Sequence, residues 1–256
     1  MKILVALKQV PARDSQIRIS ADGRWLDESD LSYEINEPDA YALEAALQLR
    51  ERHGGEVVVL CAGPERVTSS IREALAKGAD RAIHIEDDDL GAFDTLSLAR
   101  LLAVAAKTEA PDLILTGLQS DDLGGGQTGV VMAELMGFTH ATIIMAVEVN
   151  GAELRVKREL ENGLFQYVSM LLPAVLTVQS GINRLRYATL MGIKKAKSKE
   201  VRRSTAAELG VAPEPSVVLQ RVAQPQRHKQ TQMLTGTPAE QAAQLVEKLR
   251  FEVRAL

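Results

Sequence analysis

Short apolar runs alternate with longer amphipathic stretches over the first half of the chain. The runs Lys2–Leu7, Glu56–Cys61, Ala82–Ile85 and Asp112–Thr116 have the length and continuous hydrophobicity of strands that are buried on both faces. Stretches of about 12 to 18 residues between them carry apolar residues at helical spacing. The alternation predicts an α/β fold with a doubly wound, mostly parallel sheet and right-handed crossovers.

Four helices are expected in this region. The first starts after Asn36, which is a good capping residue, with Pro38 in its first turn, and it ends at His53-Gly54-Gly55. The others cover Pro64–Lys77, Ala92–Glu109 and Thr128–Leu135.

Beyond Gly137 the pattern changes to strand-like segments. These are Ala141–Val149, Glu153–Glu159, Phe165–Leu172 and Ala174–Gln179, with hairpin turns at Asn150-Gly151 and Asn162-Gly163. We therefore expect an added β-hairpin region inside a first domain, residues 1–180. Residues 181–256 hold a basic segment, a loose stretch and a last amphipathic helix, Pro238–Arg250, and are predicted to form an extended C-terminal arm.

Ligands of doubly wound sheets bind beyond the carboxyl ends of the strands. The relevant ends are Ala6, Ala62 and Gly117, which we expect to meet at one crevice. A loop with three successive glycines, 124–126, follows Gly117 and leads into the helix at Thr128. Glycine backbone and a helix N-terminus suit a phosphate group, although the loop matches neither the P-loop nor the dinucleotide fingerprint, and a plain turn is the alternative.

Composition limits the possible functions. The 256 residues contain 30 Lys and Arg against 34 Asp and Glu, a net charge of −4 that does not favour a nucleic-acid binder. The single cysteine, Cys61, excludes an internal disulfide and fits a reducing compartment. No apolar run approaches the length of a membrane span, and the N-terminus lacks the features of a signal peptide, so we expect a cytoplasmic protein.

No catalytic constellation is evident. The four histidines, His53, His84, His140 and His228, are isolated from other metal ligands, so neither a metal site nor a catalytic residue is predicted. His84 and Cys61 fit buried structural positions. Asp121 and Asp122 would repel a phosphate, so we expect them to hold a ribose hydroxyl or backbone amides, or to face water.

The basic residues that follow Gly181 have two interpretations of about equal weight. They can form a solvated arm, or they can contact an anionic partner. They are Lys194, Lys195, Lys197, Lys199, Arg202 and Arg203.

Several motifs in order carry a family resemblance. They are VKRELENGLFQYVSMLLPAVLTV (156–178), RYATLMGIKKAKSK (186–199), REALAKGADRAIHI (72–85), the Asn36 helix entry, the Ala62-Gly63-Pro64 turn and Gln127-Thr128-Gly129. With these motifs the chain resembles the β subunit of electron transfer flavoprotein over nearly its whole length. The resemblance implies a fold like that of the adenine-nucleotide α hydrolases. It also implies a non-enzymatic electron carrier in a heterodimer whose α subunit holds most of the contacts to a redox-active FAD.

The resemblance further implies a buried structural AMP in this chain. Electrons would come from flavin dehydrogenases and pass to a quinone oxidoreductase or another acceptor. The implied nucleotide shell consists of Ala6, Asn36, Glu37, Pro38, Asp39, Ala62, Gly117, Leu118, Gln119, Leu123, Gly124, Gly125, Gly126, Gln127 and Thr128. Leu190 corresponds to the family's anchor for the dehydrogenase, flanked by Tyr187 and Met191. Arg158 and Glu159 are expected to face the α subunit or the flavin edge.

The chain departs from the family pattern at three places. Leu123 and the glycines replace an acid-rich loop that ends in Asn, Arg13 stands where many members have a flavin-facing tyrosine, and Met191 replaces the usual proline. Two alternatives therefore remain: a bifurcating carrier with a second FAD in place of AMP, and an adenine-nucleotide module without a flavin partner. Gln127-Thr128-Gly129 favours AMP because it resembles the non-bifurcating pattern.

Overall fold

The computed structural model describes residues 1–88, 90–225 and 231–255. The chain divides into two compact units, Met1–Gln220 and Arg221–Leu256. The first unit thus extends past residue 180, because the segment after it contributes a helix and a strand to the α/β body.

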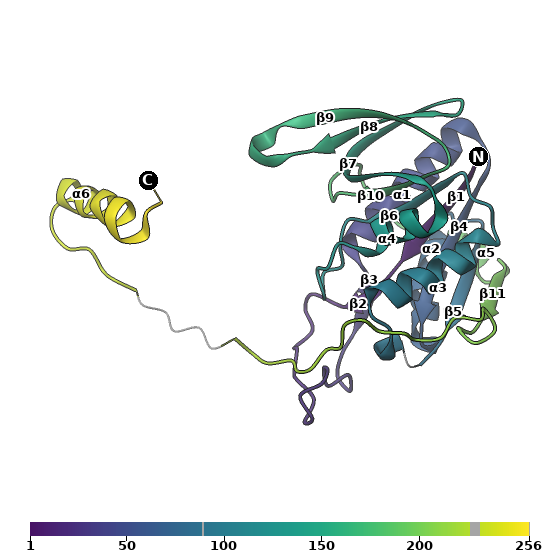
Figure 1. The fold of residues 1–256 in the computed structure, drawn as a ribbon, viewed down its shortest axis with the longest axis horizontal. Helices are drawn as coiled ribbons and strands as arrows, with labels where there is room; N and C mark the ends of the chain where they lie inside the picture. The colour runs from purple at the N-terminus through teal and green to yellow at the C-terminus, as the bar shows by residue number, and fades with distance from the viewer. Residues whose placement is uncertain (89, 226–230, 256) are drawn as a thin grey trace. The chain divides into compact units, whose positions relative to one another are not determined.

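A nine-stranded sheet forms the centre of the first unit (Figure 1). Seven strands are parallel, and β8 and β9 add an antiparallel meander beside β7. In spatial order the strands are β11 (Val201–Ser204), β5 (Arg81–Glu86), β4 (Glu56–Gly63), β1 (Lys2–Leu7), β6 (Leu113–Gly117), β10 (Ala174–Val178), β7 (Thr139–Asn150), β8 (Glu153–Glu159) and β9 (Phe165–Leu171). The predicted α/β class with a mostly parallel sheet is confirmed.

Helices cover both faces of the parallel strands (Figure 1). One face packs against α1 (Glu37–His53), α2 (Thr68–Lys77) and α5 (Leu190–Ala196), and the other against α3 (Thr95–Lys107) and α4 (Thr128–Met136). This two-sided cover explains why the central strands are apolar without interruption instead of alternating.

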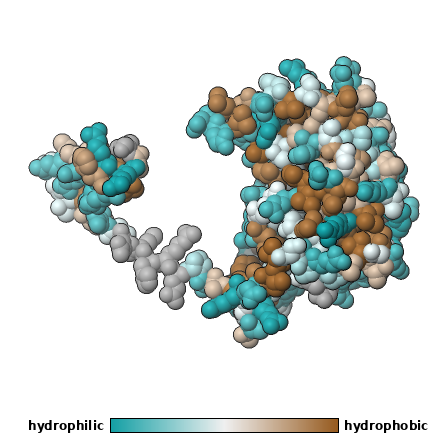
Figure 2. Space-filling model, in the orientation of Figure 1, coloured by the Kyte–Doolittle hydropathy of each residue, from teal (hydrophilic) through white to brown (hydrophobic). Residues whose placement is uncertain are grey.

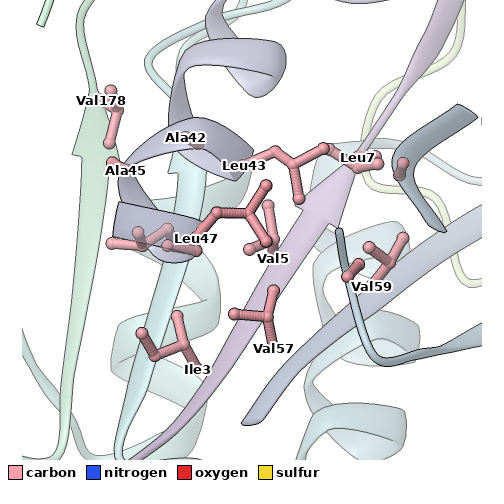
Figure 3. Close-up of a cluster of buried hydrophobic side chains, with 14 of the residues drawn as sticks. Ile3, Val5, Leu7, Ala42, Leu43, Ala45, Leu47, Val57, Val59 and Val178 are labelled. Atoms are coloured by element: carbon pink, nitrogen blue, oxygen red, sulfur yellow. The ribbon is translucent and has the colours of Figure 1, made fainter. Parts of the chain in front are cut away.

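The core on the α1 face shows how the helix pattern matches the strands. Leu43 and Leu47 of α1 are 1% and 0% exposed and lie over Ile3 and Val5 of β1 (Figure 3). Their four-residue spacing places both side chains on one face of the helix. Burial of these aliphatic groups fixes α1 over the centre of the sheet, with its N-terminus at the carboxyl edge.

Several predicted boundaries shift for local reasons. The expected helix Pro64–Lys77 is a 3-10 turn, Glu65–Val67, followed by α2. The expected helix Ala92–Glu109 starts only at Thr95, because the side chain of Asp94 forms a capping box with Ser97. A further 3-10 turn, Leu90–Ala92, precedes it.

Four elements were not predicted from the sequence: β2, β3, α5 and β11. The polar stretch after β1 contains a two-stranded ribbon, β2 (Gln9–Pro11) with β3 (Tyr33–Ile35). The basic segment contains α5 and the edge strand β11, which pairs with β5. Each of these elements is too short to show a clear hydrophobic period.

Both Asn-Gly turns connect antiparallel strands as predicted. Asn150 ends β7 before a turn to β8, and Asn162 lies in a 3-10 turn, Glu161–Gly163, between β8 and β9. Positive φ values of 58° at Asn162 and 72° at Gly163 explain this residue pair. The β8–β9 hairpin extends beyond the parallel part of the sheet (Figure 1).

The second unit contains helix α6 (Pro238–Lys248), which continues as a π-helical turn, Leu249–Val253. Thr237 and Glu240 form a capping box, and Pro238 occupies the first turn. Leu245, Val246 and Phe251 stay 48%, 47% and 68% exposed. Among the described residues of the whole chain, no helix has the length and apolar character that crossing a membrane requires.

Candidate functional site

The carboxyl ends of three neighbouring strands form one edge. β1 lies between β4 and β6, so Ala6, Ala62 and Gly117 lie at or next to the ends of adjacent strands. That they line one crevice stays a prediction. Ala6 and Ala62 each present only a methyl side chain near this edge. The N-terminus of α1 and the loop 118–127 border the same edge through the contacts described next.

Asp39 joins two of these strand ends. Its Oδ2 accepts the backbone N–H of Lys8 at 2.7 Å, just beyond β1, and its Oδ1 accepts the N–H of Gly117 at 2.8 Å, at the end of β6. A Cβ at Gly117 would lie 2.7 Å from the Cβ of Pro38 and 2.8 Å from the nitrogen of Asp39. Glycine is therefore required at position 117 for the start of α1 to approach β6 this closely.

The carboxyl group of Asp39 is buried, with the residue only 5% exposed. Burial raises the pKa of Asp39 to about 7, although the N–H donors of Lys8 and Gly117 favour the ionised form and oppose the shift. A carboxyl group with this pKa loses its proton near neutral pH, and Asp39 lies at the carboxyl edge of the sheet.

Asn36 performs a different task from the one predicted. It occupies the N-cap position of α1, but its side chain makes no capping hydrogen bond. Instead its Nδ2 donates to the carbonyl of Gln119 at 3.0 Å and its Oδ1 accepts the N–H of Asp121 at 2.9 Å. The buried amide thereby anchors the first half of the glycine loop to α1, and that contact could not be foreseen from helix-capping preferences.

Gly124 and Gly125 of the loop are exposed to solvent, and Gly126 is partly exposed. Gly124 and Gly126 have φ values of 63° and 64°, in the left-handed region, whereas Gly125 does not. A Cβ on Gly125 would meet no atom within 4 Å. Among the described residues, no hydrogen bond engages the N–H groups of Gly125, Gly126 or Gln127, so the loop can offer three donors to an anion.

Helix α4 begins directly after these donors. Thr128 is its first residue, and a Cβ at Gly129 would lie 2.7 Å from Oγ1 of Thr116 and 2.8 Å from Cγ2 of Thr177. The glycine at 129 thus lets the N-terminus of α4 pack closely on β6 and β10. That position adds the positive end of a helix dipole to the loop.

Each of the two acids in the loop is paired with a cation. Lys8 Nζ lies 2.7 Å from Oδ1 of Asp122, and Arg13 pairs with Asp121 at 3.3 Å and with Glu37. Asp122 also accepts the N–H of Leu123, as expected for an acid that holds backbone amides. These pairs reduce the repulsion that two bare carboxylates would exert on an anion.

Lys8 and Arg13 at this edge were not identified from the sequence as cations of the loop. The available signal was weak: Lys8 directly follows the first apolar strand, at the edge where ligands bind in this fold class. The partners of its side chain, Ser120 and Asp122, lie more than 110 residues away in the chain.

Three further residues of the predicted nucleotide shell, Leu118, Leu123 and Gln127, belong to the loop itself. The N–H of Leu118 donates to the carbonyl of Val178, which continues the pairing of β6 with β10. Leu123 is 64% exposed, and Gln127 precedes α4.

The predicted partner-docking residues are strongly exposed at the start of α5. Tyr187, Leu190 and Met191 are 93%, 81% and 61% exposed. Thr189 caps the helix by accepting the N–H of Gly192 at 3.0 Å. Gly192 lies against the carbonyl of Ala76 in α2 and Ala196 is buried in the core, so this short helix is held on the body while Leu190 and Met191 stay exposed.

Part of the basic segment has intramolecular partners. Arg202 pairs with the buried Glu109 at 2.9 Å, Arg203 pairs with Glu86 at 2.8 Å and with Glu65, and Lys199 donates to carbonyls at the end of α2. Lys194, Lys195 and Lys197 have no side-chain partner within the described ranges. The solvated-arm interpretation therefore fails for three of the six cations.

His84 and Cys61 are fully buried, as expected. Burial raises the pKa of the Cys61 thiol to about 12, so it is a poor nucleophile. His84 Nε2 lies 2.9 Å from the carbonyl of Gly63, and a ring nitrogen lies within 4.8 Å of carboxylate oxygens of Glu65 and Glu86. Arg203 forms an ion pair with both of those carboxylates, and the expectation of no metal stays a prediction. His228 lies outside the described residues.

The signature segment 156–178 folds into β8, β9 and β10. Arg158 donates to Oγ1 of Thr142 at 3.2 Å, and Glu159 accepts from Gln179 at 3.4 Å. The β8–β9 hairpin carries four exposed apolar residues, Leu164, Phe165, Tyr167 and Leu171. Figure 2 shows hydrophobic surface along this hairpin.

Comparison with known proteins gives one consistent result. Residues 24–209 match the family model of the electron transfer flavoprotein domain. The chain is 38% identical to the electron transfer flavoprotein subunit β of Methylophilus methylotrophus, over 96% of this chain and 97% of that protein. It is 35% identical to the subunit β of Bradyrhizobium diazoefficiens over the full length of both, and 34% identical to the mitochondrial subunit β of Oryza sativa, likewise over both full lengths.

Proposed function

Because the chain belongs to the electron transfer flavoprotein family as a β subunit, we propose that it carries electrons in a heterodimer whose α subunit holds a redox-active FAD, while this chain binds AMP. A β subunit of this family is an electron carrier and not an enzyme. The FAD supplies the redox chemistry when bound.

One observation carries the AMP proposal. The free N–H groups of the glycine loop, the N-terminus of α4 and the adjacent strand ends Ala6 and Ala62 border the same edge of the sheet. Donors for a phosphate and a small-residue floor for an adenine ring are thus available at one place. Asn36 and Asp39 would fix the walls of the site through their contacts with the loop and the strand ends.

We assign docking of a flavin dehydrogenase to the start of α5. Leu190, Tyr187 and Met191 form an exposed apolar group on a capped helix, and a few apolar side chains of this kind can carry most of the energy of a transient contact. The neighbouring Lys194, Lys195 and Lys197 would attract an acidic surface on that enzyme. Electrons would then pass to a quinone oxidoreductase or a similar acceptor.

The surface for the α subunit would include two apolar regions, one in each of the two compact units. One is the β8–β9 hairpin, and the other is the exposed face of α6. Exposed apolar side chains that lie together in this way are typical of a surface that a protein partner covers. We place the heterodimer in the cytoplasm, in line with the single buried cysteine.

The test is to co-express the chain with its α subunit, purify the complex and count the nucleotides released on denaturation. One FAD and one AMP per heterodimer are expected. Two FAD would replace the proposal by a bifurcating carrier with a second flavin in this chain. A complex without AMP or a second FAD would refute the proposed nucleotide site, and a chain that purifies with an adenine nucleotide but without an α subunit would point to a flavin-independent module.

A further inference from the structure

Lys8 lies at the middle of the carboxyl edge of the sheet. It directly follows β1, the strand between β4 and β6, and its backbone N–H is fixed by the carboxylate of Asp39. Its ammonium nitrogen reaches across the edge to the glycine loop, 2.7 Å from Oδ1 of Asp122 and 3.4 Å from Oγ of Ser120. The strand therefore positions one cation beside the loop.

The glycine loop needs a cation from elsewhere. Residues 117–128 contain two aspartates and no lysine or arginine. Within the part of the chain that the structure describes, Lys8 and Arg13 are the two cations that contact this loop. Arg13 is shared between the carboxylates of Glu37 and Asp121, so one positive charge faces two negative charges. Among the described residues, the ammonium of Lys8 forms an ion pair with one carboxylate, that of Asp122.

The ammonium of Lys8 also retains donor capacity. An ammonium group has three N–H donors, and Asp122 and Ser120 take two of them. The Lys8 side chain is 38% exposed, whereas that of Asp122 is 14% exposed. The lysine side chain of this ion pair is thus more accessible than the aspartate side chain.

From these contacts we propose that Lys8 binds the phosphate group of the nucleotide directly, with its third N–H, while it keeps its ion pair with Asp122. This inference rests on the proposed nucleotide site. The phosphate would then be held by the free N–H groups of Gly125, Gly126 and Gln127 on one side and by a charge-assisted hydrogen bond from Lys8 on the other. The ammonium also offsets the repulsion between the phosphate and the two aspartates.

A competing interpretation is that Lys8 only holds the loop through Asp122. The two interpretations differ in what Asp122→Asn does. If Lys8 binds phosphate, Asp122→Asn keeps the cation and removes a competing anion. If the ion pair merely holds the loop, Asp122→Asn and Lys8→Met damage the site equally.

The experiment uses the purified heterodimer and competition between AMP and adenosine for the site, with bound and free nucleotides measured after equilibration. Lys8→Met should reduce the preference for AMP over adenosine by about tenfold or more, since a hydrogen bond to a charged group is lost. Lys8→Arg should keep most of the preference, and Asp122→Asn should keep or increase it. FAD content and heterodimer yield serve as controls of folding, and Lys8→Gln replaces Lys8→Met if the latter does not assemble.

The outcomes separate the two proposals. If the wild-type complex contains no adenine nucleotide, the proposed site fails and the role of Lys8 fails with it. If AMP is bound but the neutral Lys8 variant keeps the wild-type preference for AMP, only the role of Lys8 is overturned. Equal losses in Lys8→Met and Asp122→Asn would also overturn it, in favour of a loop held by the ion pair.

Discussion

Asp39 and Gly117 are 78 residues apart in the chain, yet Oδ1 of Asp39 accepts the backbone N–H of Gly117 at 2.8 Å. The contact joins the start of α1 to the end of β6. It is possible only because Gly117 has no side chain. The geometry of the candidate nucleotide site therefore depends on one residue without a Cβ and one buried carboxyl group.

Gly117→Ala should destabilise the protein. The added Cβ would lie within 3 Å of Pro38 and Asp39, so α1 must move or the hydrogen bond must break. We expect a loss of about 1–3 kcal/mol in the free energy of unfolding, typical of overpacking, measured by denaturant unfolding of the heterodimer. Gly125→Ala is the matched control, because a Cβ there meets nothing within 4 Å. Equal stability of the two variants would contradict the proposed role of Gly117.

Asp39 should make stability depend on pH. Its pKa is raised by burial to about 7, above the value in the unfolded chain. Between those two pKa values the unfolded chain releases the proton while the folded chain keeps it, so stability falls as pH rises and levels off above about 7. The slope from this group is at most about 1.4 kcal/mol per pH unit.

The measurement compares unfolding of the wild type and Asp39→Asn from pH 5 to pH 8. Asn cannot ionise, so the stability difference between the two proteins should change with pH and become constant above about pH 7. A difference that stays constant over the whole range would show that Asp39 does not titrate there.

The sequence predicted most of the architecture because the strands of a parallel sheet are apolar over their whole length. It predicted the adjacency of Ala6, Ala62 and Gly117 from fold class alone. It did not predict β11 or α5, whose pairing and packing depend on β5 and α2 and not on their own pattern. Contacts such as those of Asn36 with Gln119 and of Lys8 with Asp122 join distant residues, and no local preference encodes them.

Gly125→Val is expected to separate ligand binding from folding. Because Gly125 is not in the left-handed region and its Cβ position is open, the chain itself has room for the larger side chain. A phosphate held by the loop would be obstructed, so AMP content per FAD should fall several-fold while heterodimer yield stays normal. Full AMP content in this variant would place the phosphate elsewhere.

Leu190→Ala tests the docking assignment. Leu190 is 81% exposed at the capped start of α5, so its truncation removes no core contact, and folding, heterodimer yield and FAD content should be unaffected. If Leu190 is an anchor for the dehydrogenase, the rate of electron transfer from that enzyme should fall by about tenfold or more, as for other hot-spot residues. Reduction of the FAD by a chemical reductant should not change, because that reaction needs no docking.

Val218→Ala, at a side chain that is 63% exposed in the same unit, is the control for loss of exposed apolar surface in general. Equal rates in Leu190→Ala, Val218→Ala and wild type would remove Leu190 from the docking surface.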